Sequence, residues 1–410
     1  MTPGHQSRSP GAVMSDDWQA MKTRSRRSIG ARVWITIGVI FGLVAATVGV
    51  FTFIVTRPAP TWPATGTPDH NRWYQTSLGS EAVDAAGGDY RIYAKTGTSD
   101  NLIIFFGGGG VVWDAEAAAD PITVGGYLLS GFPGAYFRSI PSFFPTTLGG
   151  ILDVNNEDNP FSDWNAVMIP YATGDFHVGD ANVSLTAADG TATDMHFNGQ
   201  TNVRLALDWI QANIPNPERL LIAGASAGSF GAAIHTPQIV DRYPESRIFQ
   251  FSEGDQLPSK KWPAVADELW DAHWRDNFGY EPGENLYERA VVANREALGD
   301  DVVFLDSNTT RDGTLIAFTA RVNDETPNPE AWSEAMRASM VRMQQNVPNY
   351  YFFLTDADPD SKGFTAHTLS SLPVAYTTKQ DGVEFLTWLA DAVIRDRPSS
   401  IGAHLLTANG

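Results

Sequence analysis

Short apolar runs alternate with amphipathic stretches along most of the chain. Runs bounded by turn residues are typical of buried strands, and we expect strands at 89–97, 101–106, 164–171, 219–224, 247–253, 315–322 and 350–355. Apolar residues at helical spacing predict helices over 201–214, 227–243 and 381–396. Because strands and helices alternate, the pattern predicts an α/β fold with a mainly parallel central sheet that helices cover on both faces.

Two segments depart from this alternation. Residues 121–160 are rich in Gly, Pro and aromatic residues, and residues 262–300 have a helical pattern with Trp262, Trp270 and Trp274. We interpret both segments as cap-like insertions that shape a substrate cleft, with packing against the body as the alternative. The main domain then runs over residues 73–400.

A different pattern precedes this domain. Residues 33–55 are 23 uncharged and mostly apolar residues, and residues 1–32 carry six Lys or Arg and two Asp. A helix of this length spans a bilayer core of about 30 Å, and the preceding basic residues predict a cytoplasmic tail and an extracytoplasmic body. Residues 56–72 are then a Pro/Thr-rich linker. The alternative is a cleaved signal peptide, whose apolar region is usually shorter.

Composition narrows the chemistry. The 410 residues contain no cysteine, which excludes disulfides, thiol nucleophiles and cysteine metal sites. The net charge is −19, although the first 32 residues are basic, so the body is strongly acidic. A nucleic-acid-binding protein is expected to present a basic face instead.

The sequence GASAG at 224–228 is a nucleophile-elbow motif. It stands between an apolar strand-like run and a helical stretch, as the strand-turn-helix geometry of an α/β-hydrolase requires. We therefore predict Ser226 as a nucleophile. The alternative is that Ser226 only fills a tight turn.

A serine esterase also needs a histidine base and a carboxylate to hold it. His367 is the one histidine that lies in a loop after a late strand, so we predict it as the base. For the acid we favour Asp324, at the end of the run 315–322, over Asp306, which ends another apolar run.

The oxyanion of such a reaction needs main-chain N–H donors. The apolar run 101–106 ends in four glycines, which present N–H groups without a side chain. We predict Gly108, Gly109 and Ala227 as the donors. A phosphate loop is the alternative, but the Lys-Ser/Thr pair of a P-loop is missing.

Asp175, His177 and Asp180 suggest a metal site at first sight. Two carboxylates and one histidine so close in sequence make a poor ligand set. We interpret the segment as a loop that borders the cleft, and expect neither a metal nor a cofactor.

Several motifs together resemble the pectinacetylesterase/Notum family of serine carboxylesterases. They occur in the family's order at 105–114, 159–180, 197–210, 224–232, 320–324 and 363–367. The resemblance covers roughly residues 75–395. It implies an α/β-hydrolase-like fold, a triad of Ser226, Asp324 and His367, and an oxyanion hole built by the glycine run that begins at Gly107.

The chain departs from the family at four positions. Family members often carry cysteines where Val112, Ala172 and Ala225 stand here, and a second glycine where Ser229 follows Gly228. The resemblance implies hydrolysis of acyl esters, most simply acetyl esters, on a small molecule or a polysaccharide. The alternatives are a lipid or protein deacylase of the same fold and a non-catalytic binding module at the cell surface.

Overall fold

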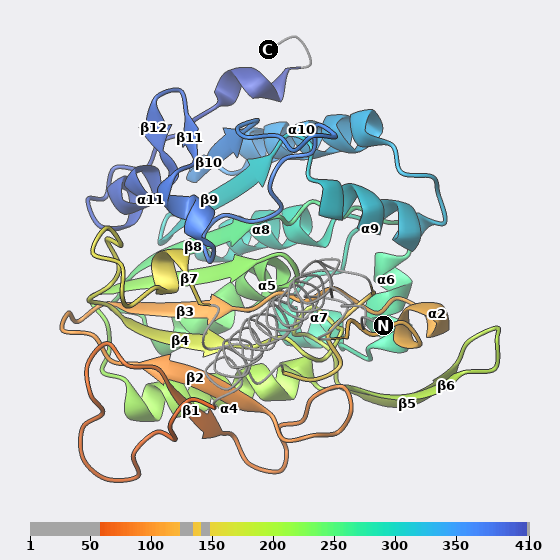
Figure 1. The fold of residues 1–410 in the computed structure, drawn as a ribbon, viewed down its shortest axis with the longest axis horizontal. Helices are drawn as coiled ribbons and strands as arrows, with labels where there is room; N and C mark the ends of the chain where they lie inside the picture. The colour runs from red at the N-terminus through yellow and green to blue at the C-terminus, as the bar shows by residue number, and fades with distance from the viewer. Residues whose placement is uncertain (1–57, 124–133, 141–147, 408–410) are drawn as a thin grey trace, which may run out of the picture. The chain divides into compact units, whose positions relative to one another are not determined.

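The computed structural model describes residues 58–123, 134–140 and 148–407. Within these residues, eight strands form a central sheet in the order β1-β2-β4-β3-β7-β8-β9-β10 (Figure 1). The six strands from β4 to β10 pair in parallel, whereas β2 is antiparallel to both of its neighbours. The prediction of a mainly parallel sheet is confirmed.

The strands match most of the predicted runs. Their bounds are β1 Tyr74–Ser77, β2 Arg91–Lys95, β3 Leu102–Phe106, β4 Asn165–Ile169, β7 Arg219–Ala225, β8 Arg247–Glu253, β9 Val302–Thr309 and β10 Tyr350–Thr355. Two hairpins lie outside the sheet, β5 Ala181–Thr186 with β6 Ala192–Phe197 and β11 Lys379–Gln380 with β12 Val383–Glu384.

Both faces of the sheet are buried. In β3, Leu102 and Ile104 pack into one apolar cluster while Ile103 and Phe105 pack into the other, because successive side chains of a strand point to opposite faces. This is why the central strands read as unbroken apolar runs.

Helices cover the two faces unequally. The larger cluster includes residues of α4, α5, α8 and α10, and the smaller cluster includes residues of α11. The helix bounds are α2 Ala115–Ala118, α4 Gly199–Asn213, α5 Ala227–Arg242, α6 Trp262–Ala264, α7 Trp274–Phe278, α8 Leu286–Leu298, α9 Gly313–Asn323, α10 Pro329–Asn346 and α11 Phe385–Val393. Short 3₁₀ turns lie at Gly150–Leu152, Pro373–Tyr376 and Ala403–Leu406, and a π-helical turn at Val265–Leu269.

The expected strand at 315–322 is wrong. These residues belong to helix α9. The apolar run before them, Val302–Thr309, forms strand β9 of the central sheet instead. The Asp312 carboxylate accepts the N–H of Leu315 at 2.9 Å and so caps the first turn of α9. Asp324 therefore follows a helix and not a strand of the sheet.

The predicted helical segment 262–300 is confirmed as α6, the π-helical turn, α7 and α8, and its three tryptophans are buried. In the other insertion, Ala135 and Phe137 pair with Val111 and Gly109 beside the glycine run. The basic tail and the apolar segment 33–55 lie outside the described residues. None of the helices that the structure describes is long and apolar enough to cross a membrane.

Candidate active site

Ser226 stands between β7 and α5 in a strained turn. Its φ and ψ are 56° and −126°, and α5 begins at the next residue. A positive φ is uncommon outside glycine and often marks a functional turn. Ser226 is fixed from both sides, because its N–H donates to the carbonyl of Glu253 at 2.9 Å and its carbonyl accepts the N–H of Ser229 at 2.9 Å.

The glycines of the motif are required by close packing. A Cβ on Gly224 would lie 2.1 Å from the carbonyl oxygen of Gly228. A Cβ on Gly228 would lie 2.0 Å from the carbonyl oxygen of Phe106, at the end of β3. The turn therefore brings α5 against two strands at a distance that side chains would prevent, as the elbow geometry demands.

His367 lies in the loop after β10, with 13% of its side chain exposed. Its Nδ1 is 2.6 Å from Oδ2 of Asp312, and the Asp312 side chain is 2% exposed. Burial by itself lowers the pKa of His367, but the charge and hydrogen bond of Asp312 and the charge of Glu253 outweigh it, so the pKa is raised. The contact at Nδ1 leaves Nε2 as the ring nitrogen for proton exchange.

Asp312 holds two groups at once. One carboxylate oxygen caps α9 through Leu315, and the other contacts His367. The residue follows β9 by three positions, at the edge of the sheet where β7 presents Ser226. Asp312 therefore occupies the position expected of a triad acid.

The structure does not bring Asp324 to this cluster. Asp324 ends α9, at the opposite end of the helix from Asp312. Its side chain is 77% exposed and accepts a hydrogen bond from Lys261 Nζ at 2.7 Å. The expectation that Asp324 contacts His367 is corrected in favour of Asp312.

The alternative acid, Asp306, is also directed elsewhere. It lies inside β9, fully buried, where it accepts hydrogen bonds from Asn308 Nδ2 at 2.8 Å and from the Tyr350 hydroxyl at 2.5 Å. Burial raises the pKa of Asp306 above its ordinary value. Its carboxylate belongs to a polar cluster within the core.

The glycine run, Gly107–Gly110, follows β3 directly and passes beside Ser226. A Cβ on Gly108 would lie 2.8 Å from Ser226 Cβ, so the main chain at Gly108 is packed directly against the serine. Among the described residues, no acceptor partners the main-chain N–H groups of Gly108, Gly109 or Ala227. Ala227 and Gly110 line the pocket beside Ser226. Gly108 and Ala227 thus lie beside Ser226, whereas Gly109 faces Phe137 and Tyr171, and the role of all three as donors stays a prediction.

His177 contacts the first residue of the glycine run. Its Nε2 is 3.0 Å from the carbonyl oxygen of Gly107, and burial lowers the pKa of His177 to about 3, so the ring is a neutral donor. Asp175 accepts main-chain N–H groups of His177, Gly179 and Gly199. These groups hold a loop, as the sequence predicted for this segment, and within the described residues no cluster suited to a metal is found.

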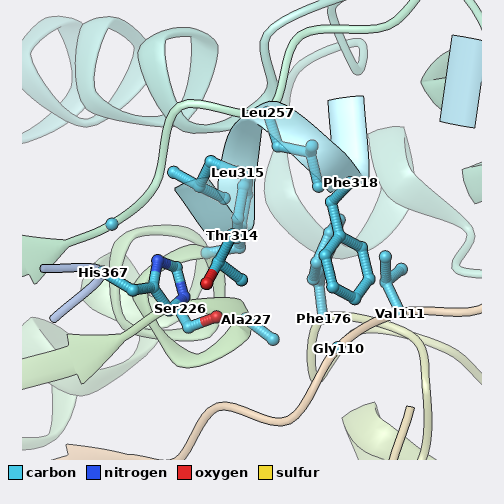
Figure 2. A pocket seen from close by; sticks show the side chains of 12 residues that line it. Gly110, Val111, Phe176, Ser226, Ala227, Leu257, Thr314, Leu315, Phe318 and His367 are labelled. Atoms are coloured by element: carbon cyan, nitrogen blue, oxygen red, sulfur yellow. The ribbon is translucent and has the colours of Figure 1, made fainter. Parts of the chain in front are cut away.

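Ser226 and His367 lie together at one side of a pocket (Figure 2). The rest of the wall is mostly apolar and comes from α5, α9 and the loops around them. It consists of Val111, Phe176, Phe230, Leu257, Leu315 and Phe318, with Gly110, Gly254, Ala227 and Thr314. Such a wall accepts the hydrocarbon part of an acyl group.

Asp312 and Glu253 are the residues that sequence reasoning missed. A signal for each was present, because both acids stand at or just after a buried run, where parallel strands present polar groups. For Asp312 the helix-capping pattern, Asp three residues before Leu315, was a second signal.

Comparisons with known proteins agree with this architecture. The family model described as pectinacetylesterase matches residues 89–254. The pectin acetylesterase 11 of Arabidopsis thaliana is 25% identical over 150 residues, which cover 36% of this chain and 34% of the relative. The chain thus matches about a third of that relative's length.

Two solved structures of the Wnt deacylase Notum from Drosophila share the fold. Each has a TM-score of 0.54, with 15% and 16% identity over 79% and 81% of this chain, and 94% and 96% of the Notum chain. These two similarities show a Notum-like α/β-hydrolase fold. With the family model, they confirm the resemblance to the pectinacetylesterase/Notum family.

Proposed function

We propose that this protein is a serine carboxylesterase in which Ser226 is the nucleophile, His367 the general base and Asp312 the carboxylate that orients His367. The observation that carries the proposal is the joint position of Ser226 and His367 at one pocket, with His367 Nδ1 bound to a buried Asp312. Asp312 stabilises the imidazolium and fixes the ring so that Nε2 accepts the serine proton.

In the first step, Ser226 Oγ attacks the ester carbonyl carbon and its proton passes to Nε2 of His367. The carbonyl oxygen becomes an oxyanion, and we expect the N–H groups of Ala227 and of the glycine run to stabilise it, because they have no other acceptor among the described residues. His367 then gives the proton to the leaving alkoxide as the carbon–oxygen bond breaks, which produces an acyl-enzyme on Ser226.

In the second step, water replaces the alcohol. His367 takes a proton from the water, the hydroxide attacks the acyl carbon, and the bond to Ser226 Oγ breaks as His367 returns the proton to the serine. The free acid leaves, and the enzyme is restored. Atoms and protons balance over the two steps with these side chains and water.

Acetyl esters of a small molecule or polysaccharide are the first substrate class, supported by the pectinacetylesterase family match. A deacylase for longer acyl groups is the second candidate, because Phe176, Phe230 and Phe318 make the wall apolar, although the cavity volume of about 20 Å³ fits a short acyl group better. A series of p-nitrophenyl esters from two to twelve carbons separates them. Highest kcat/KM at two carbons followed by acetate release from acetylated polysaccharides supports the first candidate, and a maximum at eight or more supports the second.

The esterase proposal is tested by Ser226→Ala, His367→Ala and the double variant. Each single variant is expected to lose nearly all kcat on a short-chain ester, and the double variant to be barely worse, because serine and histidine act as one unit. Circular dichroism checks folding. Near-wild-type activity in folded Ser226→Ala, or wild-type protein that fails to react with a fluorophosphonate, favours the non-catalytic binding module instead.

A further inference from the structure

Glu253 is the last residue of β8 and lies beside the elbow. It pairs with Ala225 in the register of β7 and β8, and its carbonyl oxygen accepts the N–H of Ser226 at 2.9 Å. Only 1% of the residue is exposed. The main chain of Glu253 therefore fixes the strained serine directly.

The side chain of Glu253 reaches the loop that carries His367. Its carboxylate accepts the N–H of Leu369 at 2.8 Å, the N–H of Ser370 at 3.0 Å and the hydroxyl of Ser370. All three partners are donors, so the ionised carboxylate is the form that fits. Burial raises the pKa of Glu253, while the hydroxyl and N–H donors oppose that shift.

The next residue completes the contact with the base. Gly254 has a φ of +62°, and a Cβ there would lie 2.8 Å from the carbonyl oxygen of His367 and 3.1 Å from its Cε1. The chain therefore turns immediately after Glu253 and backs the imidazole. A side chain at this position would displace the ring or the main chain of His367.

We propose that Glu253 is a positioning residue that couples the nucleophile elbow to the loop of the base, through its carbonyl on Ser226 and its carboxylate on the residues after His367. The proposal rests on the proposed esterase function. Glu253 acts through Ser226 and His367, while Asp312 holds the other side of the imidazole. The two catalytic groups thus have a common anchor at the end of β8.

The arrangement has an electrostatic consequence. The charged groups that act on His367 are Asp312, ahead of α9, and Glu253, at the end of β8, and both raise its pKa against the effect of burial. Conversely, the charge of His367 lowers the pKa of Glu253. Removing the Glu253 charge therefore lowers the pKa of His367, and the base stays neutral to lower pH.

The test measures kcat and KM on p-nitrophenyl acetate against pH for the full chain, Glu253→Gln, Glu253→Ala and Ser370→Ala. In Glu253→Gln the amide oxygen still accepts hydrogen bonds, so we expect kcat to fall roughly tenfold with KM unchanged, and the acid limb of kcat/KM to move to lower pH. Glu253→Ala leaves three donors without an acceptor and is expected to lose roughly 10²-fold in kcat, as misplacement of a catalytic group does.

Asp84→Asn is the matched control. Asp84 is also a buried carboxylate that accepts two main-chain N–H groups, from Ala86 and Gly88, but its charge is not among those that act on His367. The acid limb of kcat/KM in Asp84→Asn is expected to stay at the wild-type position. Ser370→Ala keeps the carboxylate and removes one donor, so a several-fold loss in kcat is expected even where Glu253→Ala does not fold.

The outcomes separate the two proposals. Wild-type protein no more active than Ser226→Ala overturns the esterase function itself. If wild type is active and Ser226→Ala is not, an acid limb in Glu253→Gln identical to that of wild type overturns the positioning role, whatever its kcat. An unchanged kcat in folded Ser370→Ala overturns it as well.

Discussion

His367 is held by groups that differ in what they control. Asp312 contacts Nδ1 and sets the orientation of the ring, whereas Gly254 and Glu253 set the path of the loop around it. The oxyanion side has its own support, because His177 fixes the carbonyl of Gly107. His367 and the glycine run thus each depend on a buried side-chain contact that a single substitution removes, whereas Ser226 is held by main-chain contacts.

The pKa of His367 sets the acid limit of the activity. The imidazole accepts a proton only in its neutral form, and its pKa is raised above the ordinary value of about 6.5. We expect kcat/KM to fall as pH decreases through a midpoint above about 6.5. A pH–rate profile on a short-chain ester measures this, and a midpoint below pH 6 contradicts the arrangement of carboxylates described here.

Asp312→Asn and Asp324→Asn distinguish the two acids. Asp312→Asn removes the charge at Nδ1, so we expect kcat to fall by several orders of magnitude, with His367 in the wrong tautomer. Asp324→Asn removes only an exposed ion pair with Lys261, which contributes about 0–1 kcal/mol, and is expected to leave kcat within twofold of wild type. The measurement is kcat of both folded variants on one ester. The reverse ranking contradicts the assignment of Asp312.

At the scale of elements, β3, β7 and α5 meet without side chains between them. Gly228→Ala places a Cβ 2.0 Å from the Phe106 carbonyl, so α5 or β3 must shift, and we expect a loss of about 3 kcal/mol in the free energy of unfolding. Gly279→Ala is the comparison, because nothing lies within 4 Å of its Cβ and only its left-handed backbone, with φ 81° and ψ 4°, is strained, at about 1–2 kcal/mol. Chemical denaturation measures both. Equal losses contradict the close approach.

Most of the sheet was predictable because its strands are short apolar runs between turn residues. The exception, 315–322, shows the limit of that signal: periodicity does not separate a short buried helix from a strand. A strand at 315–322 would place Asp324 at the edge of the sheet. In the structure Asp324 follows the last residue of the 11-residue helix α9, about 16 Å from the start of that helix. Ser226 and His367 were found because their positions depend on a motif and on chain order, not on that assignment.

At the scale of the whole molecule, charge and apolarity are distributed unevenly along the chain. Six basic residues stand within residues 1–32, 23 uncharged residues follow, and the acidic residues are concentrated in the remainder. This order is that of an anchor whose basic flank stays in the cytoplasm. We propose that residues 33–55 anchor the protein and that the esterase domain lies outside the membrane.

This orientation is testable in intact spheroplasts. We expect added protease to digest the esterase domain and to leave an epitope tag placed before residue 33 protected, because the basic residues hold that end on the cytoplasmic side. Detergent lysis is the control, since it must expose the tag. Replacing the four basic residues Lys22, Arg24, Arg26 and Arg27 by Gln is expected to weaken the bias and protect part of the population of esterase domains. A domain protected in wild-type spheroplasts while the tag is digested would show the opposite orientation, and a domain recovered in the medium without the tag would show a cleaved signal peptide.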